Sequence, residues 1–143
     1  MIAAAAPRRW SDDVDGIRWL PRLIDKARLW NRGVLGTYLF GHSPVDRALL
    51  ARLEIATDEF AKIVAAAPDD EAVLGALRAR GFDEARVRRW SDRLPKPFQI
   101  ILRMIDLDEG YLVPSMFERA WMGTFRVAEG GLMSLVRAVR PKP

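Results

Sequence analysis

Residues that start and stop helices recur along this sequence, and they limit how long any helix can be. Ser43, Asp69 and Asp83 each stand as an N-cap before an apolar stretch, and Gly33 and Gly81 each follow one. Between these signals the apolar residues recur at helical spacing. The pattern predicts an all-α fold, a compact bundle of about six to seven short helices.

The length of 143 residues and a hydrophobic content of 50% suit one helical domain over residues 1–143. Within it, residues 1–12 are candidates for disorder. Residues 113–140 predict a C-terminal helical hairpin, because Ser115 followed by Glu118 forms a capping box. Such a hairpin could pack on its own core, cover a pocket or form an interface between copies, and the sequence leaves all three open.

Residues 98–107 are the most apolar part of the chain, with only Gln99, Arg103 and Asp106 polar. A helix that is hydrophobic on nearly every side is a central one, so we expect this helix in the core. Carboxylates follow at Asp108 and Glu109, but their spacing departs from that of a calcium loop. Ordinary ion pairs are therefore expected there, and no metal site.

The composition narrows the function classes. The chain has no Cys, which excludes disulfides, thiolate nucleophiles and thiolate zinc sites, and its single His argues against a zinc or haem protein. No apolar run approaches the roughly 20 residues that span a bilayer, and the opening residues lack the features of a secretory signal. We expect a cytoplasmic protein with no cofactor and no membrane partner.

The net charge of +4 lies wholly in the second half of the chain. Residues 1–70 carry ten basic and ten acidic groups, whereas residues 71–143 carry thirteen and nine. The sharpest cluster, which could form a phosphate-contacting face, is Arg86, Arg88, Arg89, Trp90 and Arg93.

Two observations argue against nucleic-acid binding by this cluster. All but four of the 23 basic residues are Arg in an Ala-rich chain, a pattern that a GC-rich genome produces without selection for binding. The excess is also diluted among carboxylates, whereas phosphate binding needs basic groups gathered on one face. We therefore expect a solvated helix with Trp90 in the core, and nucleic acid is the partner that we expect least.

Residues 20–31 predict a helix with an apolar stripe. Its members are Leu20, Leu23, Ile24, Ala27 and Trp30. On another face Arg18, Arg22 and Lys26 follow one another at i,i+4 steps, which favours a solvated basic face. Asp25 lies three residues before Arg28 and can form a weak ion pair with it.

A glycine-bounded aromatic connector follows this helix. Gly36 and Gly41 bracket residues 37–40, which predict an extended and buried segment. Ser43 and Pro44 then start the next helix as N-cap and first residue.

The connector and the start of this next helix hold the candidate site. The catalytic candidates are Tyr38, His42, Asp46 and Arg47, with His42 as proton carrier and Arg47 as anion clamp. The ligand-binding candidates are Asp25, Lys26 and Arg47. The simpler alternative, which we favour, is that His42 is a loop residue and that Asp46 and Arg47 brace neighbouring helices by ion pairs.

Three segments of the chain, LPRLIDKAR, GTYLFGHSPVDRALL and MIDLDEGYL, together resemble a bacterial family, Domain of Unknown Function 5069. The resemblance covers about residues 17–112. It implies a small, soluble, mainly helical bacterial domain, and it supplies no catalytic residues.

Three functional classes remain. The first is a non-enzymatic accessory or interaction protein that self-associates, with a homo-oligomer contact through the C-terminal helices. The second is a protein or enzyme that binds a small anionic ligand at residues 38–47. The third is nucleic-acid binding through residues 86–93.

Overall fold

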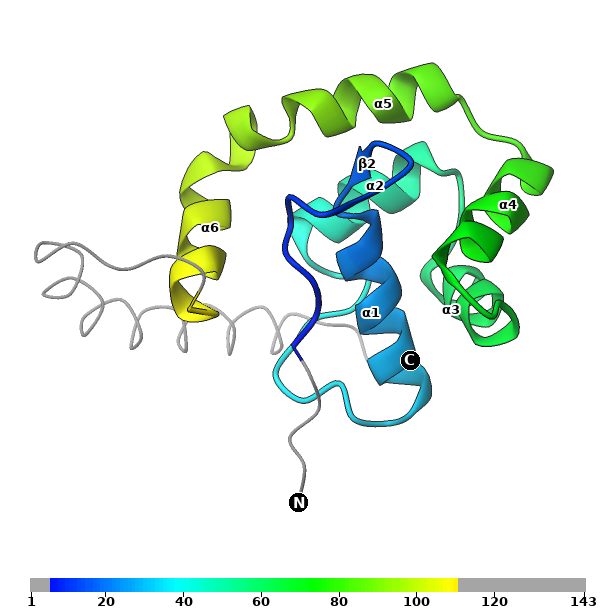
Figure 1. The fold of residues 1–143 in the computed structure, drawn as a ribbon, viewed down its shortest axis with the longest axis horizontal. Coiled ribbons are helices and arrows are strands. Elements are labelled where there is room, and N and C mark those ends of the chain that lie inside the picture. The colour runs from blue at the N-terminus through cyan, green and yellow to red at the C-terminus, as the bar shows by residue number, and fades with distance from the viewer. Residues whose placement is uncertain (1–5, 111–143) are drawn as a thin grey trace, which may run out of the picture. The chain divides into compact units, whose positions relative to one another are not determined.

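The structure, a computed structural model, describes residues 6–110 (Figure 1). The predicted hairpin over residues 113–140 lies outside the described residues. The chain divides into two compact units, Met1–Arg103 and Met104–Pro143, and of the second unit only residues 104–110 are described. The single-domain organisation stays a prediction.

The described residues form six helices and one two-stranded hairpin, which confirms the all-α fold class. In chain order the elements are β1 (Asp13–Val14), β2 (Ile17–Arg18), α1 (Leu20–Asn31), α2 (Pro44–Arg52), α3 (Thr57–Ala66), α4 (Asp70–Arg80), α5 (Glu84–Arg93) and α6 (Pro95–Asp108).

The hairpin of β1 and β2 was not predicted. Val14 pairs with Ile17, and the two residues between them, Asp15 and Gly16, have φ angles of 49° and 81°. Two consecutive positive φ angles are the mark of a type I′ turn, for which Asp-Gly is a favoured sequence. This dipeptide is the signal that could have found the hairpin.

Three of the predicted N-caps are confirmed by hydrogen bonds. The Ser43 side chain accepts from the Asp46 backbone N at 3.1 Å, Asp69 caps α4, and Asp83 caps α5. At α3 the N-cap position is held by Ala56, which makes no side-chain cap hydrogen bond, and Thr57 is the first helical residue.

The core of the first unit is built around α1, which packs on α3 and on β1 (Figure 1). α4 packs on α3 and β1, while α5 packs on β2 and α2. The largest side chains with almost no exposure include Trp19, Phe60, Ile17, Leu20, Leu23, Ile24, Leu49 and Leu77. The predicted stripe of α1 is thus confirmed except at its last member, because Trp30 is 54% exposed.

The expectation that residues 98–107 form a central helix is wrong. On α6, Ile100 is 74% and Ile101 is 42% exposed, whereas Leu102 is buried. An apolar sequence shows that a helix face avoids water, but it does not show whether the same chain covers that face. Among the described residues, no helix is long and apolar enough to cross a membrane.

Candidate functional site

Asp46, in the first turn of α2, lies at the centre of a buried polar cluster. Its side chain has 0% exposure. The carboxylate accepts hydrogen bonds from the Trp19 indole Nε1 at 2.7 Å and from the Gly41 backbone N at 2.9 Å. Lys26 Nζ lies 2.7 Å from each of the two oxygens. Asp46 therefore links α1, the connector and α2.

Lys26 is the cation of this cluster, and it is only 3% exposed. Besides Asp46, its ammonium group donates to the Leu39 backbone carbonyl at 3.0 Å and lies 5.2 Å from the Trp19 ring centroid. A buried ammonium group is tolerated only when it is paired and hydrogen-bonded, and these contacts meet that need.

The prediction of a solvated basic face on α1 is therefore wrong, because two of its three members are buried and the third, Arg18, is half-buried and lies in β2. Like Lys26, Arg22 is buried, with 4% exposure. Its guanidinium carbon lies 5.3 Å from the Trp19 ring centroid and 5.9 Å from that of Tyr38. Spacing at i,i+4 showed that these cations share a face, but not that the connector and Trp19 cover it.

Trp19 reaches Asp46 from an unusual backbone conformation. It is the N-cap residue of α1 with a φ of 70°, in the left-handed region. A bulky residue there carries backbone strain of roughly 1–2 kcal/mol. The buried indole and its hydrogen bond to Asp46 offset this strain. Sequence reasoning did not place Trp19 in the site.

Gly41 supplies the backbone N–H that approaches Asp46. Its φ is 76°, and a Cβ at this position would overlap the side chain of Thr57. Because both the conformation and the space exclude a side chain, glycine is required here. The prediction of an extended and buried segment between Gly36 and Gly41 holds only in part, because Leu39 and Phe40 are buried whereas Thr37 is exposed and lies in a turn.

The four catalytic candidates differ in burial. Asp46 is buried, whereas His42 and Arg47 are exposed and Tyr38 is half-buried. Within residues 6–110, Arg47 forms no ion pair, so it does not brace a neighbouring helix as the simpler alternative expected, while Asp46 does. Whether Tyr38, His42 and Arg47 bind a ligand stays a prediction.

Asp25 joins a second cluster rather than the one around Asp46. Arg8 donates to Asp25 at 3.0 Å and to Asp70 at 3.1 Å. Arg28 bridges the same two carboxylates, at 3.3 Å from Asp25 and 3.0 Å from Asp70. The predicted pair of Asp25 with Arg28 is confirmed, and the cluster ties residue 8 to α1 and α4.

This second cluster shifts the pKa values of its members. The Arg8 guanidinium lies beside the Asp70 carboxylate and holds the pKa of Asp70 below its ordinary value of 3.8. Arg28 also lowers the pKa of Asp70. Reciprocally, Asp70 and Asp25 raise the pKa of Arg8. Both groups are therefore charged at neutral pH.

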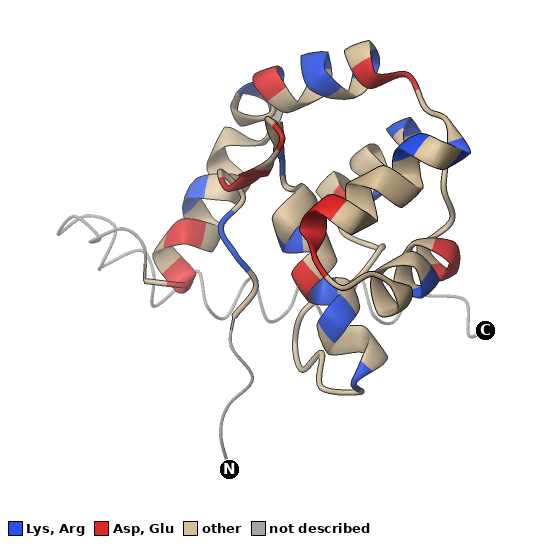
Figure 2. Cartoon of the chain, turned by 45° about the vertical axis from the view of Figure 1, so that its right-hand side comes forward, with Lys and Arg blue, Asp and Glu red and all other residues tan. Residues whose placement is uncertain are grey.

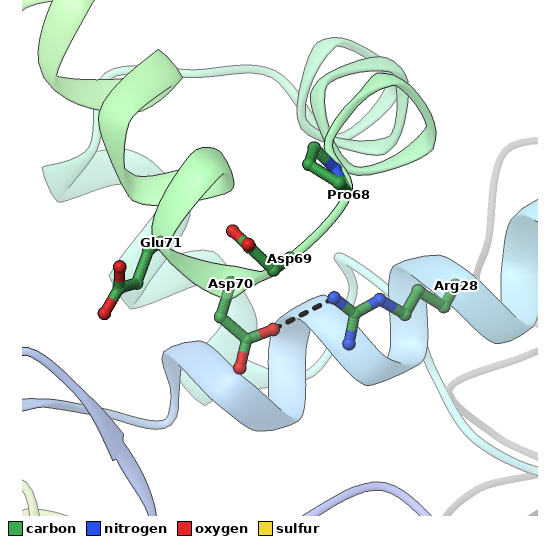
Figure 3. Close-up of a pocket in the computed structure, with 5 residues that line it drawn as sticks. All are labelled: Arg28, Pro68, Asp69, Asp70 and Glu71. Carbon is green, nitrogen blue, oxygen red and sulfur yellow. Dashed lines mark hydrogen bonds and ion pairs between the residues drawn. The ribbon is translucent and has the colours of Figure 1, made fainter.

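An open hollow beside this cluster is lined by Arg28, Pro68, Asp69, Asp70 and Glu71 (Figure 3). Its polar groups are largely engaged, because Asp69 caps α4 by accepting from the Ala72 N at 2.8 Å and Asp70 is paired with Arg28. The hollow is thus the surface of the ion-pair cluster that connects α1 with α4. Within residues 6–110 no group of three or more His, Asp or Glu could hold a metal ion.

The geometry assigns the buried cluster a structural role. The carboxylate of Asp46 is surrounded by four protein donor contacts, and the ammonium of Lys26 is directed at Asp46 and Leu39. A substrate would have to displace these contacts to reach either group. Of the ligand candidates, Lys26 and Asp25 point to different partners although they are adjacent on α1.

A family model described as "Domain of unknown function (DUF5069)" matches residues 4–99. The match begins and ends earlier than the predicted resemblance over residues 17–112. No curated protein and no solved structure matches the chain.

Proposed function

The chain belongs to the DUF5069 family, a domain of unknown function, and on this premise we propose that it is a non-enzymatic interaction protein that self-associates through its C-terminal helices. In this proposal Ile100 and Ile101 of α6 take part in the contact between copies. The single observation that carries it is the exposure of these two side chains, 74% and 42%.

Two adjacent exposed isoleucines make α6 a favourable contact. Burial of apolar surface contributes roughly 25 cal/mol per Å², so an isoleucine buried between copies adds about 1.5–3 kcal/mol. Exposed apolar groups in contiguous patches are typical of protein contacts. A second copy is a suitable occupant because it brings the same apolar face, and a symmetric dimer pairs each patch with itself.

The buried cluster supports the non-enzymatic part of the proposal. The best-placed acid and base of the candidate site, Asp46 and Lys26, form a 2.7 Å ion pair with each other. Both are nearly inaccessible to solvent, at 0% and 4% side-chain exposure. A pair in this state stabilises the fold and is not available for proton transfer.

The test is sedimentation velocity of the full chain over a range of concentrations. Wild-type protein should show a concentration-dependent dimer, and Ile100→Glu should shift the equilibrium to monomer, because a carboxylate cannot be buried unpaired in an apolar contact. Val34→Glu is the matched control, since Val34 is also apolar and exposed, at 47%, but lies between α1 and the connector.

Two results would overturn the proposal. A wild-type chain that stays monomeric at the highest soluble concentration excludes self-association. A dimer that Val34→Glu breaks and Ile100→Glu leaves intact places the contact near the end of α1 instead of α6.

A further inference from the structure

A short segment of the chain is strongly basic. Residues 86–96 carry five basic groups and one acidic group, a net charge of +4. The whole chain has 23 basic and 19 acidic groups, so the remaining residues carry eighteen of each. The surplus of this segment alone equals the net charge of the whole chain, so its basic groups are locally concentrated.

Three of these cations lie on one face of α5. Arg86, Arg89 and Arg93 follow one another at i, i+3 and i+7, the spacing of a single helix face, and all three are exposed. Figure 2 shows basic positions in blue along α5. In the described part of the chain none of the three forms an ion pair. Lys96, at the start of α6, is also exposed and without an ion pair there.

The neighbouring Arg88 shows how a structural arginine of the same helix behaves. Its guanidinium donates to the Asp15 backbone carbonyl at 2.7 Å and lies 3.1 Å from the Asp15 carboxylate. A further contact joins it to Glu84 at 3.7 Å. Arg88 therefore connects α5 to the hairpin, whereas the three arginines of the outer face make no ion pair among the described residues.

The side of α5 opposite the outer face is anchored to the hairpin of β1 and β2. Ser91, which is fully buried, accepts a hydrogen bond from the Arg18 N at 2.7 Å and donates to the Gly16 carbonyl at 3.2 Å. Val87 is also fully buried beneath the helix. The arginine side chains thus extend from a backbone that is anchored on the opposite side.

We propose that the outer face of α5, formed by Arg86, Arg89 and Arg93, together with Lys96 at the start of α6, binds the phosphate backbone of double-stranded nucleic acid without reading its sequence. Guanidinium groups form charge-assisted hydrogen bonds with phosphate oxygens. From Arg86 to Arg93 the helix rises about 10 Å, a length over which one strand of a duplex carries about three phosphates when measured along the duplex axis.

A duplex fits this face better than a single strand does. Binding of single strands relies on exposed aromatic side chains on which bases stack. The aromatic residue of α5, Trp90, is half-buried and has the Arg52 guanidinium 5.6 Å from its ring centroid. Contacts are therefore directed to the backbone of the duplex. Trp90 was predicted to lie in the core, but it is only half-buried.

The test is fluorescence anisotropy of a labelled DNA duplex titrated with the full chain at several salt concentrations. Four phosphate contacts predict a slope of log K against log salt of about −3.6, which is a loss of about a hundredfold between 50 and 200 mM salt. The triple variant Arg86→Gln/Arg89→Gln/Arg93→Gln should reduce the slope to about −1 and weaken binding at least tenfold at about 100 mM salt.

The matched control removes the same charge from other surfaces. Arg32→Gln/Lys62→Gln/Arg80→Gln replaces three exposed cations whose ion pairs, where present, are 3.9 Å long. This control should keep a slope near the wild-type value. Ile100→Glu should also bind the duplex, because the proposal does not depend on self-association.

Three results would overturn the proposal. They are absence of duplex binding at the lowest salt, equal affinities of the α5 triple variant and the control, and binding to vesicles of anionic lipid without binding to the duplex. The last result would assign the same arginines to a membrane surface.

Discussion

The charged groups around α1 differ from those on the outer face of α5 in whether the protein itself pairs them. Lys26 is buried against Asp46, and Asp25 and Arg28 belong to a cluster with Arg8 and Asp70. In contrast, Arg86 and Arg93 are exposed and have no ion pair among the described residues. The comparison separates charges that hold the fold from charges that remain available to a partner.

The difference follows from the cost of burial. Taking a charge out of water costs several kcal/mol unless a partner compensates it, so Lys26 requires Asp46. An exposed guanidinium keeps its hydration, and an ion pair on the surface adds about 0–1 kcal/mol. Arginines can therefore stay unpaired on α5 without loss of stability, and their local density needs another explanation.

The largest expected effect is at Asp46. Asp46→Asn leaves the Lys26 ammonium buried without a counter-charge, so the free energy of unfolding should fall by about 3–5 kcal/mol. Urea unfolding measures this change. Adding Lys26→Met to Asp46→Asn should recover a large part of the loss, because no uncompensated buried charge remains.

Asp25→Asn is the comparison for Asp46→Asn, because Asp25 is also paired but its side chain is 20% exposed. It should lower the free energy of unfolding by only about 1 kcal/mol. Equal effects of the two substitutions would remove the distinction between the buried pair and the partly exposed cluster.

A smaller, pH-dependent effect is expected at Asp70. Its pKa is lowered by Arg8 in the folded state, so its contribution to stability is present above the ordinary value of 3.8 and is lost as the pH falls through the lower folded value. At neutral pH, Asp70→Asn should lower the free energy of unfolding by about 1 kcal/mol, because solvent screens the partly exposed cluster. The difference from wild type should disappear in strong acid.

Asp69→Asn is the control for this measurement. It removes a neighbouring carboxylate but keeps an N-cap on α4, since Asn caps as well as Asp. Its stability at neutral pH should stay close to that of wild type. If both variants lose the same stability at every pH, the cluster around Arg8 does not account for the acid sensitivity.

Helix ends were predictable because they depend on local chemistry. Ser43, Asp69 and Asp83 cap helices through contacts three residues away, so their role is visible in the sequence. The hairpin turn also has a local signal, the Asp15-Gly16 dipeptide, but the sequence was interpreted as helical only.

The site was only partly predictable because its contacts are distant in sequence. Asp46 and Lys26 were both named as candidates, but their pairing spans 20 residues and depends on how the connector turns at Gly41. The role of Trp19 depends on a positive φ, for which a tryptophan gives no sequence signal. Likewise, periodicity showed that α6 is apolar without showing that Ile100 would be exposed.

The most direct test of the division between paired and available charges is the urea unfolding of Arg86→Gln/Arg89→Gln/Arg93→Gln beside Asp46→Asn. The account predicts that the triple variant unfolds at the wild-type midpoint with the wild-type slope, whereas Asp46→Asn unfolds at a clearly lower urea concentration. A triple variant that is destabilised as much as Asp46→Asn would show that the arginines of α5 hold the fold, which contradicts the account.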